Sequence, residues 1–266
     1  MYSHTKELSN LIEELSKLES NKKVKDFIKK YKVWFAFFEE ILNKITKDTI
    51  SPKIHALVAT SKIIILTGLA ESLGTGNTCS TKFSHFLSFL SIEEKLFFSL
   101  IFKIKASNNK KAEELYEKHL ETGDNIFIDQ LVDISTKSDD LYQVEVADIM
   151  NSFLADDEKK LDIFFKRRAN LFYGVRSKIV HEGSPDVIGA MFSSNMETTM
   201  YYGEKENKFF TIKYPIEEFF IRAAYRIIGQ EPKKINIEDF LWNNFISHHS
   251  PRIAKIVAKI ERKNNI

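Results

Sequence analysis

The chain has 266 residues, of which 43% are hydrophobic, so it has enough apolar content to bury a large core. Its 39 Lys and Arg residues nearly balance 37 Asp and Glu residues, which excludes a globally basic nucleic-acid-binding protein. One cysteine excludes an internal disulfide, and the N-terminus shows no signal-peptide pattern, so we expect a cytoplasmic protein.

Apolar residues recur at intervals of three and four along most of the chain, and only 9 glycines and 5 prolines interrupt them. The pattern predicts an all-α protein. The most apolar runs are far shorter than the roughly 20 residues of a membrane span, so we expect no membrane insertion. Helices are predicted over residues 5–20, 24–46, 52–73, 81–90, 92–106, 108–121, 125–134, 139–154, 157–181, 216–228, 237–246 and 251–263.

Two of these segments are predicted to lie deep in the protein. Residues 24–46 carry a dense series of large apolar side chains that includes Trp34, and residues 52–73 are apolar nearly all round. We expect the second segment at the centre of the core.

The chain shows no linker long enough to separate independent domains. We therefore expect one helical domain, with residues 1–48 as an N-terminal extension, 49–230 as the core with insertions and 231–266 as C-terminal helices. Residues 197–214 are rich in Thr, Tyr, Phe and Ile around a glycine-containing turn, which predicts a short β-hairpin after the helix at 157–181.

The helix at 157–181 carries the most informative residues. Tyr173, Ser177 and His181 are spaced four apart, so they lie on neighbouring parts of one face, and Arg176 is next to Ser177. This face gathers a guanidinium, a hydroxyl and an imidazole at the end of the helix, because Pro185 cannot continue it.

An arginine followed after a short interval by a histidine on a late helix resembles the HEPN superfamily. The likeness is greatest to its Apea-like branch, in which a tyrosine precedes the arginine and a glycine follows the histidine, as Tyr173, Arg176, His181 and Gly183 do here. Such proteins often carry a glutamate on an apolar upstream helix, and Glu71 occupies that place. The resemblance implies a HEPN-like helical bundle, in which Glu71 could hold Arg176.

The resemblance also implies an activity, namely metal-independent cleavage of RNA by attack of the ribose 2′-OH on the adjacent phosphate. Arg176 and His181 would be the catalytic residues, with Tyr173, Ser177 and Glu71 in support. It further implies a homodimer with a composite active site, no cofactor, and a toxin or phage-defence effector that has an antitoxin or another defence-system protein as partner.

The residue chemistry agrees with this reading. Histidine titrates near neutral pH and can move a proton, while arginine presents a planar fork of donors that matches phosphate oxygens. Basic side chains on the same helix could follow an RNA backbone; they are Lys166, Arg167, Arg168 and Lys178.

Three alternatives compete with the nuclease. Ser177, where many active relatives have Asn, Asp or His, and Glu182, beside the histidine, favour a catalytically inactive module that binds RNA or a protein. The nearly neutral charge favours a helical scaffold. His181 could also be an ordinary histidine that the helix dipole favours at a C-terminus. No Cys, His or carboxylate spacing predicts a metal site.

Overall fold

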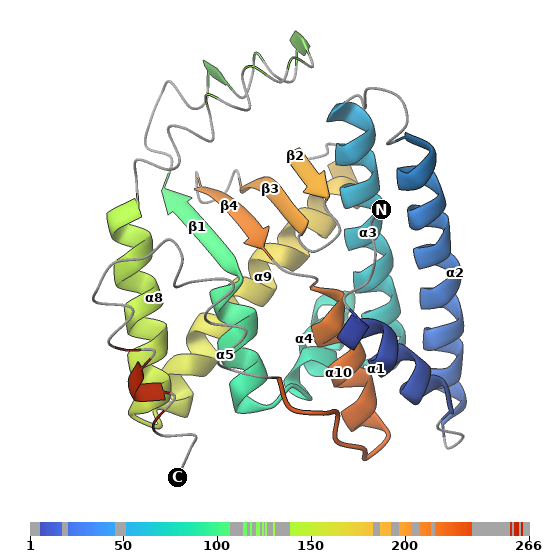
Figure 1. Cartoon of the computed structure of the whole chain (residues 1–266), viewed down its shortest axis with the longest axis vertical. Helices are drawn as coiled ribbons and strands as arrows, with labels where there is room; N and C mark the ends of the chain where they lie inside the picture. Colours follow the sequence, from blue (N-terminus) through green and yellow to red (C-terminus); the bar gives the residue numbers. More distant parts are fainter. Residues whose placement is uncertain are drawn as a thin grey trace.

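The computed structural model describes residues 6–17, 21–45, 52–106, 139–182, 187–192, 197–203, 208–213 and 216–235, with single positions between 114 and 130 and between 256 and 262. The all-α prediction is confirmed in part: the described residues are mostly helical (Figure 1), but four strands are also present among them. The helices are α1 (Lys6–Lys17), α2 (Lys22–Ile45), α3 (Pro52–Leu73), α4 (Cys79–Ser88), α5 (Ile92–Leu100), α8 (Asp139–Leu154), α9 (Glu158–Glu182) and α10 (Glu217–Ile227).

Four strands form one antiparallel sheet in the order β1-β4-β3-β2. They are β1 (Phe102–Ala106), β2 (Val187–Phe192), β3 (Glu197–Gly203) and β4 (Lys208–Lys213). β3 and β4 occupy the residues for which a hairpin was expected, with Gly203 opposite Lys208. The sheet is larger than that hairpin, because β2 pairs with β3 and β1 pairs with β4.

The prediction of one helix over residues 92–106 was wrong after Leu100. Helix α5 ends at Leu100, and the chain continues as β1, which is antiparallel to β4 with Phe102 opposite Ile212. Both of these side chains are buried, so the start of β1 is anchored in the core. The helices expected at 108–121, 125–134 and 237–246 lie almost entirely outside the described residues, as does most of 251–263.

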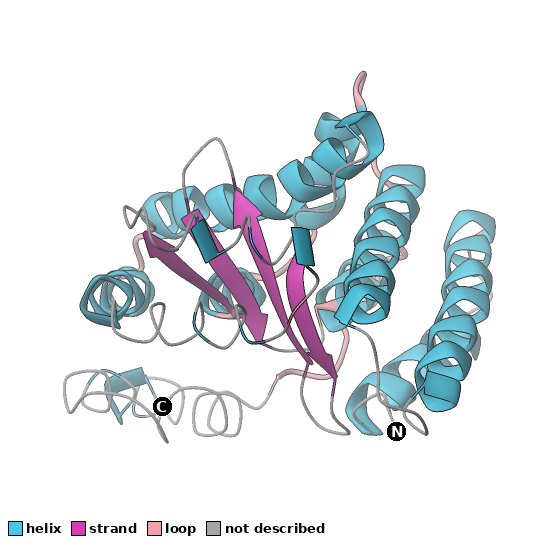
Figure 2. Cartoon of the chain, turned by 90° about the horizontal axis from the view of Figure 1, so that it is seen from above, coloured by secondary structure: helices cyan, strands magenta, loops and turns pink. Residues whose placement is uncertain are grey.

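Helix α3 lies at the centre of the fold, as predicted from its composition. It packs against α2, α4, α9 and α10 and against strand β2. Figure 2 shows α2 at one edge of the molecule, with α3 between it and the sheet. The central position of α3 means that a side chain near its end can reach the motif helix α9.

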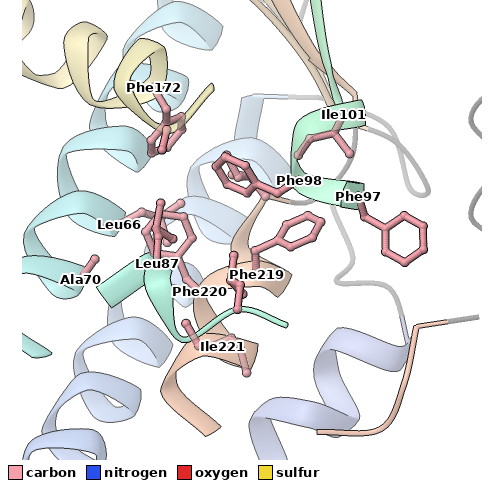
Figure 3. Close-up of a cluster of buried hydrophobic side chains, with 14 of the residues drawn as sticks. Leu66, Ala70, Leu87, Phe97, Phe98, Ile101, Phe172, Phe219, Phe220 and Ile221 are labelled. Atoms are coloured by element: carbon pink, nitrogen blue, oxygen red, sulfur yellow. The ribbon is translucent and has the colours of Figure 1, made fainter. Parts of the chain in front are cut away.

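One contiguous core joins these elements, including α1 and α2, which had been expected as an extension. Its middle is aromatic: Phe98 lies 5.4 Å from Phe219 and 5.3 Å from Phe165, measured between ring centroids. Figure 3 shows how α3, α4, α5, α9 and α10 supply side chains to this cluster. Labelled members include Leu66, Leu87, Phe97, Phe98, Phe172, Phe219 and Phe220.

Candidate functional site

Helix α9 presents the predicted motif with one side in the core and the other at the surface. Phe172 and Val175 are buried at 0% and 4% exposure, and they fix the rotation of the helix. Residues four apart advance by about 40° around an α-helix. Tyr173 and Ser177 are accordingly half-buried, and His181 is exposed.

Arg176 reaches across to α3 and forms an ion pair with Glu71. Its Nη2 lies 3.3 Å from Glu71 Oε1 and donates a hydrogen bond of 3.4 Å to Oε2. The two side chains are only 16% and 13% exposed, so the charges meet at the edge of the core. The contact expected between Glu71 and Arg176 is therefore present.

This ion pair leaves hydrogen-bonding capacity unused. Among the described residues, Arg176 Nε and Glu71 Oε1 are buried without a hydrogen-bond partner. Oε1 is close enough to Nη2 for a charge contact but is not aligned for a hydrogen bond. Unused donors and acceptors of this kind let the guanidinium exchange partners at a smaller cost than a fully bonded pair would.

Tyr173 lies against the same arginine. Arg176 Cζ is 5.4 Å from the centre of the Tyr173 ring, which is a cation–π contact. The Tyr173 ring also contacts Phe83 of α4, with 5.2 Å between the ring centroids. Burial raises the pKa of the Tyr173 hydroxyl; the Arg176 charge opposes this rise, while the Glu71 carboxylate adds to it. Tyr173 is thus a neutral phenol beside the Arg176–Glu71 pair.

His181 stands apart from this cluster. It is the penultimate residue of α9 and is exposed, which leaves its ring accessible to a substrate or to another chain. Five residues separate it from Arg176, equivalent to about 7.5 Å along the axis and about 140° around it. One copy of α9 therefore directs the arginine towards α3 and the histidine into solvent.

The four basic residues expected to bind RNA have different environments. Lys166 is exposed and pairs with Asp162 at 2.6 Å, and Arg167 is also exposed, 3.6 Å from Glu145. Both guanidinium and ammonium groups can thus be reached from outside. The side chain of Lys178 lies outside the described residues.

The expectation for Arg168 was wrong. Its side chain is 1% exposed, and Nη2 lies 2.8 Å from Glu145 Oε2 on α8. Arg168 precedes Phe172 by four residues and Val175 by seven, which is the spacing of the buried stripe of α9. It joins α8 to α9 rather than meeting a phosphate backbone.

A buried network of charged side chains is present that the sequence analysis does not predict. Arg222 of α10 donates to Glu218 at 2.8 Å and to Glu94 at 3.4 Å, and Arg226 pairs with the same Glu94. Two signals were available: Ser91 and Glu94 have the spacing of a capping box, and Glu218 and Arg222 are four apart on a helix. The network links α5 to α10 beneath the core.

Comparison with family models, with curated proteins and with solved structures finds no match. In the part of the chain that the structure describes, no helix is both long and apolar enough to span a membrane. Within the same residues, no three His, Cys, Asp or Glu side chains gather as a group that could hold a metal ion.

Proposed function

We propose that the protein is a HEPN-type endoribonuclease that cleaves RNA without a metal ion. The observation that carries the proposal is the arrangement at the end of α9. Glu71 and Tyr173 orient Arg176, and five residues later the His181 side chain is exposed. An oriented cation and an accessible imidazole are the two groups that this reaction requires.

In the proposed reaction, His181 takes the proton of a ribose 2′-OH, and the 2′-oxygen attacks the adjacent phosphorus. The bond from phosphorus to the 5′-oxygen breaks, and a 2′,3′-cyclic phosphate forms. Arg176 donates to the non-bridging oxygens, where negative charge increases in the transition state. The departing 5′-oxygen takes a proton from water.

A second copy of α9 would complete this chemistry. Arg176 and His181 of one chain lie on different sides of the helix, about 140° apart. A two-fold related partner places its own motif opposite the first, so that the arginine of one chain and the histidine of the other face one substrate. The proposed site is therefore composite and the active form a homodimer.

Cleavage of mixed RNA in EDTA tests the proposal, with wild type compared to Arg176→Ala and His181→Ala. Both substitutions should lower the rate by about 100-fold or more, and wild type should yield 2′,3′-cyclic phosphate ends. Arg262→Ala, at an exposed arginine in the C-terminal segment, is the matched control. Cleavage by both folded variants at the wild-type rate would refute the nuclease. Growth arrest on expression, lost in His181→Ala, would support a toxin or defence role.

A second candidate is a catalytically inactive HEPN module that binds RNA or a protein, and the Glu71 ion pair favours it. A guanidinium already paired with a carboxylate stabilises the charge of a transition state less well, but it can still contact a phosphate of uncut RNA. In that case wild type binds RNA in EDTA without cleaving it, and Arg176→Ala weakens the binding. RNA cleavage by wild type that is lost in His181→Ala would exclude this candidate.

A further inference from the structure

The outward face of α2 carries a concentration of positive charge that the proposed active site does not include. Its inward face is buried against the core, whereas six exposed lysines and one aspartate, Asp26, occupy the first three turns of its outward face. Among the described residues, none of the six lysines forms an ion pair. They are Lys22, Lys23, Lys25, Lys29, Lys30 and Lys32.

Exposed apolar side chains follow directly on the same helix. Val33 is 63% exposed, Trp34 42% and Phe37 47%, although this segment was expected to pack deeply. The Trp34 and Phe37 rings lie 5.8 Å apart in an edge-to-face arrangement. Residues Lys30, Trp34 and Phe37 are spaced four and three apart, so lysines and rings share one continuous face.

We propose that this face of α2, from Lys22 to Phe37, binds single-stranded RNA. Lysine ammonium groups suit a phosphate backbone, and exposed aromatic rings suit unpaired bases, which can stack on them whatever their sequence. The choice of RNA over DNA rests on the proposed ribonuclease function. The excess of cations and the exposed rings rest on the structure alone.

An anionic membrane is the competing occupant, and the packing of α2 argues against it. A helix that lies on a bilayer inserts a long apolar face between the lipids. The long apolar stripe of α2 is already buried in the protein core, and among the α2 side chains that the structure describes only one turn of large apolar residues is exposed. The outward face is therefore cationic along its length and aromatic at one end, which fits a nucleic acid strand.

Two sets of variants separate the contributions of charge and stacking. Lys29→Gln with Lys30→Gln removes two cations and retains good helix formers, and Trp34→Leu with Phe37→Leu keeps apolar surface without aromatic rings. Lys118→Gln with Lys234→Gln, at exposed lysines outside α2, matches the charge change. All variants are made in the His181→Ala chain in EDTA, so that bound RNA is not cut.

Fluorescence anisotropy of a labelled oligouridine measures the affinity. Both α2 variants should bind about tenfold or more weakly than the parent, and the matched control should bind like it. The lysine variant should also have a salt dependence less steep by about 1.4 in the slope of log affinity against log salt, since each lost phosphate contact contributes about 0.7. In a Trp242→Phe chain, Trp34 is the sole tryptophan, and oligouridine should quench its fluorescence.

Three outcomes would overturn the inference. Equal affinity of the parent and both α2 variants for oligouridine would show that α2 does not contact RNA. Equal affinity of the parent for oligothymidine and oligouridine would show that RNA is not the specific ligand. Binding to phosphatidylserine vesicles, with the Leu variant still bound, would show a membrane surface instead. Cleavage of RNA together with binding that does not depend on α2 would support the ribonuclease and refute this inference. Binding that depends on α2, by a wild-type chain that never cleaves RNA, would refute the ribonuclease and support RNA binding by α2.

Discussion

Glu71 and Arg176 make the contact that joins α3 to the motif helix, and it lies where the solvent is nearly excluded. Glu71→Gln removes the negative charge and leaves the guanidinium at the edge of the core without its counter-ion. We expect a loss of about 1–3 kcal/mol in the free energy of unfolding, because a charged hydrogen bond is weakened and not replaced. Urea denaturation would measure it, with the exposed Glu121→Gln as a control that should change little. Equal stability of both variants would show that the pair contributes nothing.

Tyr173, beside this ion pair, makes the stability of the protein depend on pH. Burial raises the pKa of Tyr173 above its ordinary value of 10, so the folded state keeps its proton at a pH where the unfolded state loses it. Stability from this group is complete below pH 10 and declines as pH rises through the folded pKa. Chemical denaturation between pH 8 and about 11 should show a shallower decline for Tyr173→Phe than for wild type. Parallel declines in the two proteins would contradict it.

Helical spacing predicts which side chains of α9 are buried, whereas charge and adjacency in the sequence do not. The motif predicts the contact of Glu71 with Arg176, whereas the prediction of RNA binding by Lys166, Arg167 and Arg168 rests on their charge alone. Consecutive residues turn by about 100° on a helix, so three neighbours cannot share one face. Arg168 falls on the same side as Phe172 and is buried, and only the spacing to the core stripe distinguishes it from its neighbours.

Between α8 and α9 the main polar link is Glu145 with Arg168, and its burial makes it sensitive to loss of one partner. Glu145→Ala removes the carboxylate from a guanidinium that is 1% exposed, so we expect a loss of about 3 kcal/mol or more. Lys166→Ala removes an ion pair with Asp162 on the surface of the same helix and should cost less than about 1 kcal/mol. Thermal unfolding of the two variants compares them, and a smaller loss for Glu145→Ala would contradict the prediction.

At the scale of elements, local periodicity located the helices well and the sheet poorly. The bounds of α3 and α8 match the predicted segments, because long runs of three and four spacing leave little choice. Strand β1 was read as the end of a helix, since its five residues follow α5 without a turn signal. Its partner β4 lies about a hundred residues later in the chain, and no local pattern shows such a pairing.

At the scale of the whole molecule, the N-terminal helices α1 and α2 pack into the common core. The Tyr225 hydroxyl on α10 donates to the carbonyl of Leu11 at 3.0 Å, and α1 and α2 contribute to the same core as α9. This arrangement leaves α2 at one edge of the molecule and α8 at the opposite edge (Figures 1 and 2). The six lysines at the start of α2 are exposed. Composition alone could not locate that charge, because the totals of acids and bases nearly cancel.

The proposed composite site predicts a result that only a mixture of variants can show. If the arginine of one chain works with the histidine of its partner, Arg176→Ala and His181→Ala chains are each inactive alone, yet a dimer of one with the other contains one intact pair. Random exchange makes half of the dimers mixed, and each keeps one of two sites, so the mixture should recover about a quarter of wild-type cleavage. Mixing the two purified variants after mild denaturation and refolding, then assaying RNA cleavage in EDTA, measures this. Recovery near a quarter requires shared sites, whereas a mixture as inactive as its components, with dimers present by sedimentation, would place each arginine and histidine in the same chain's site.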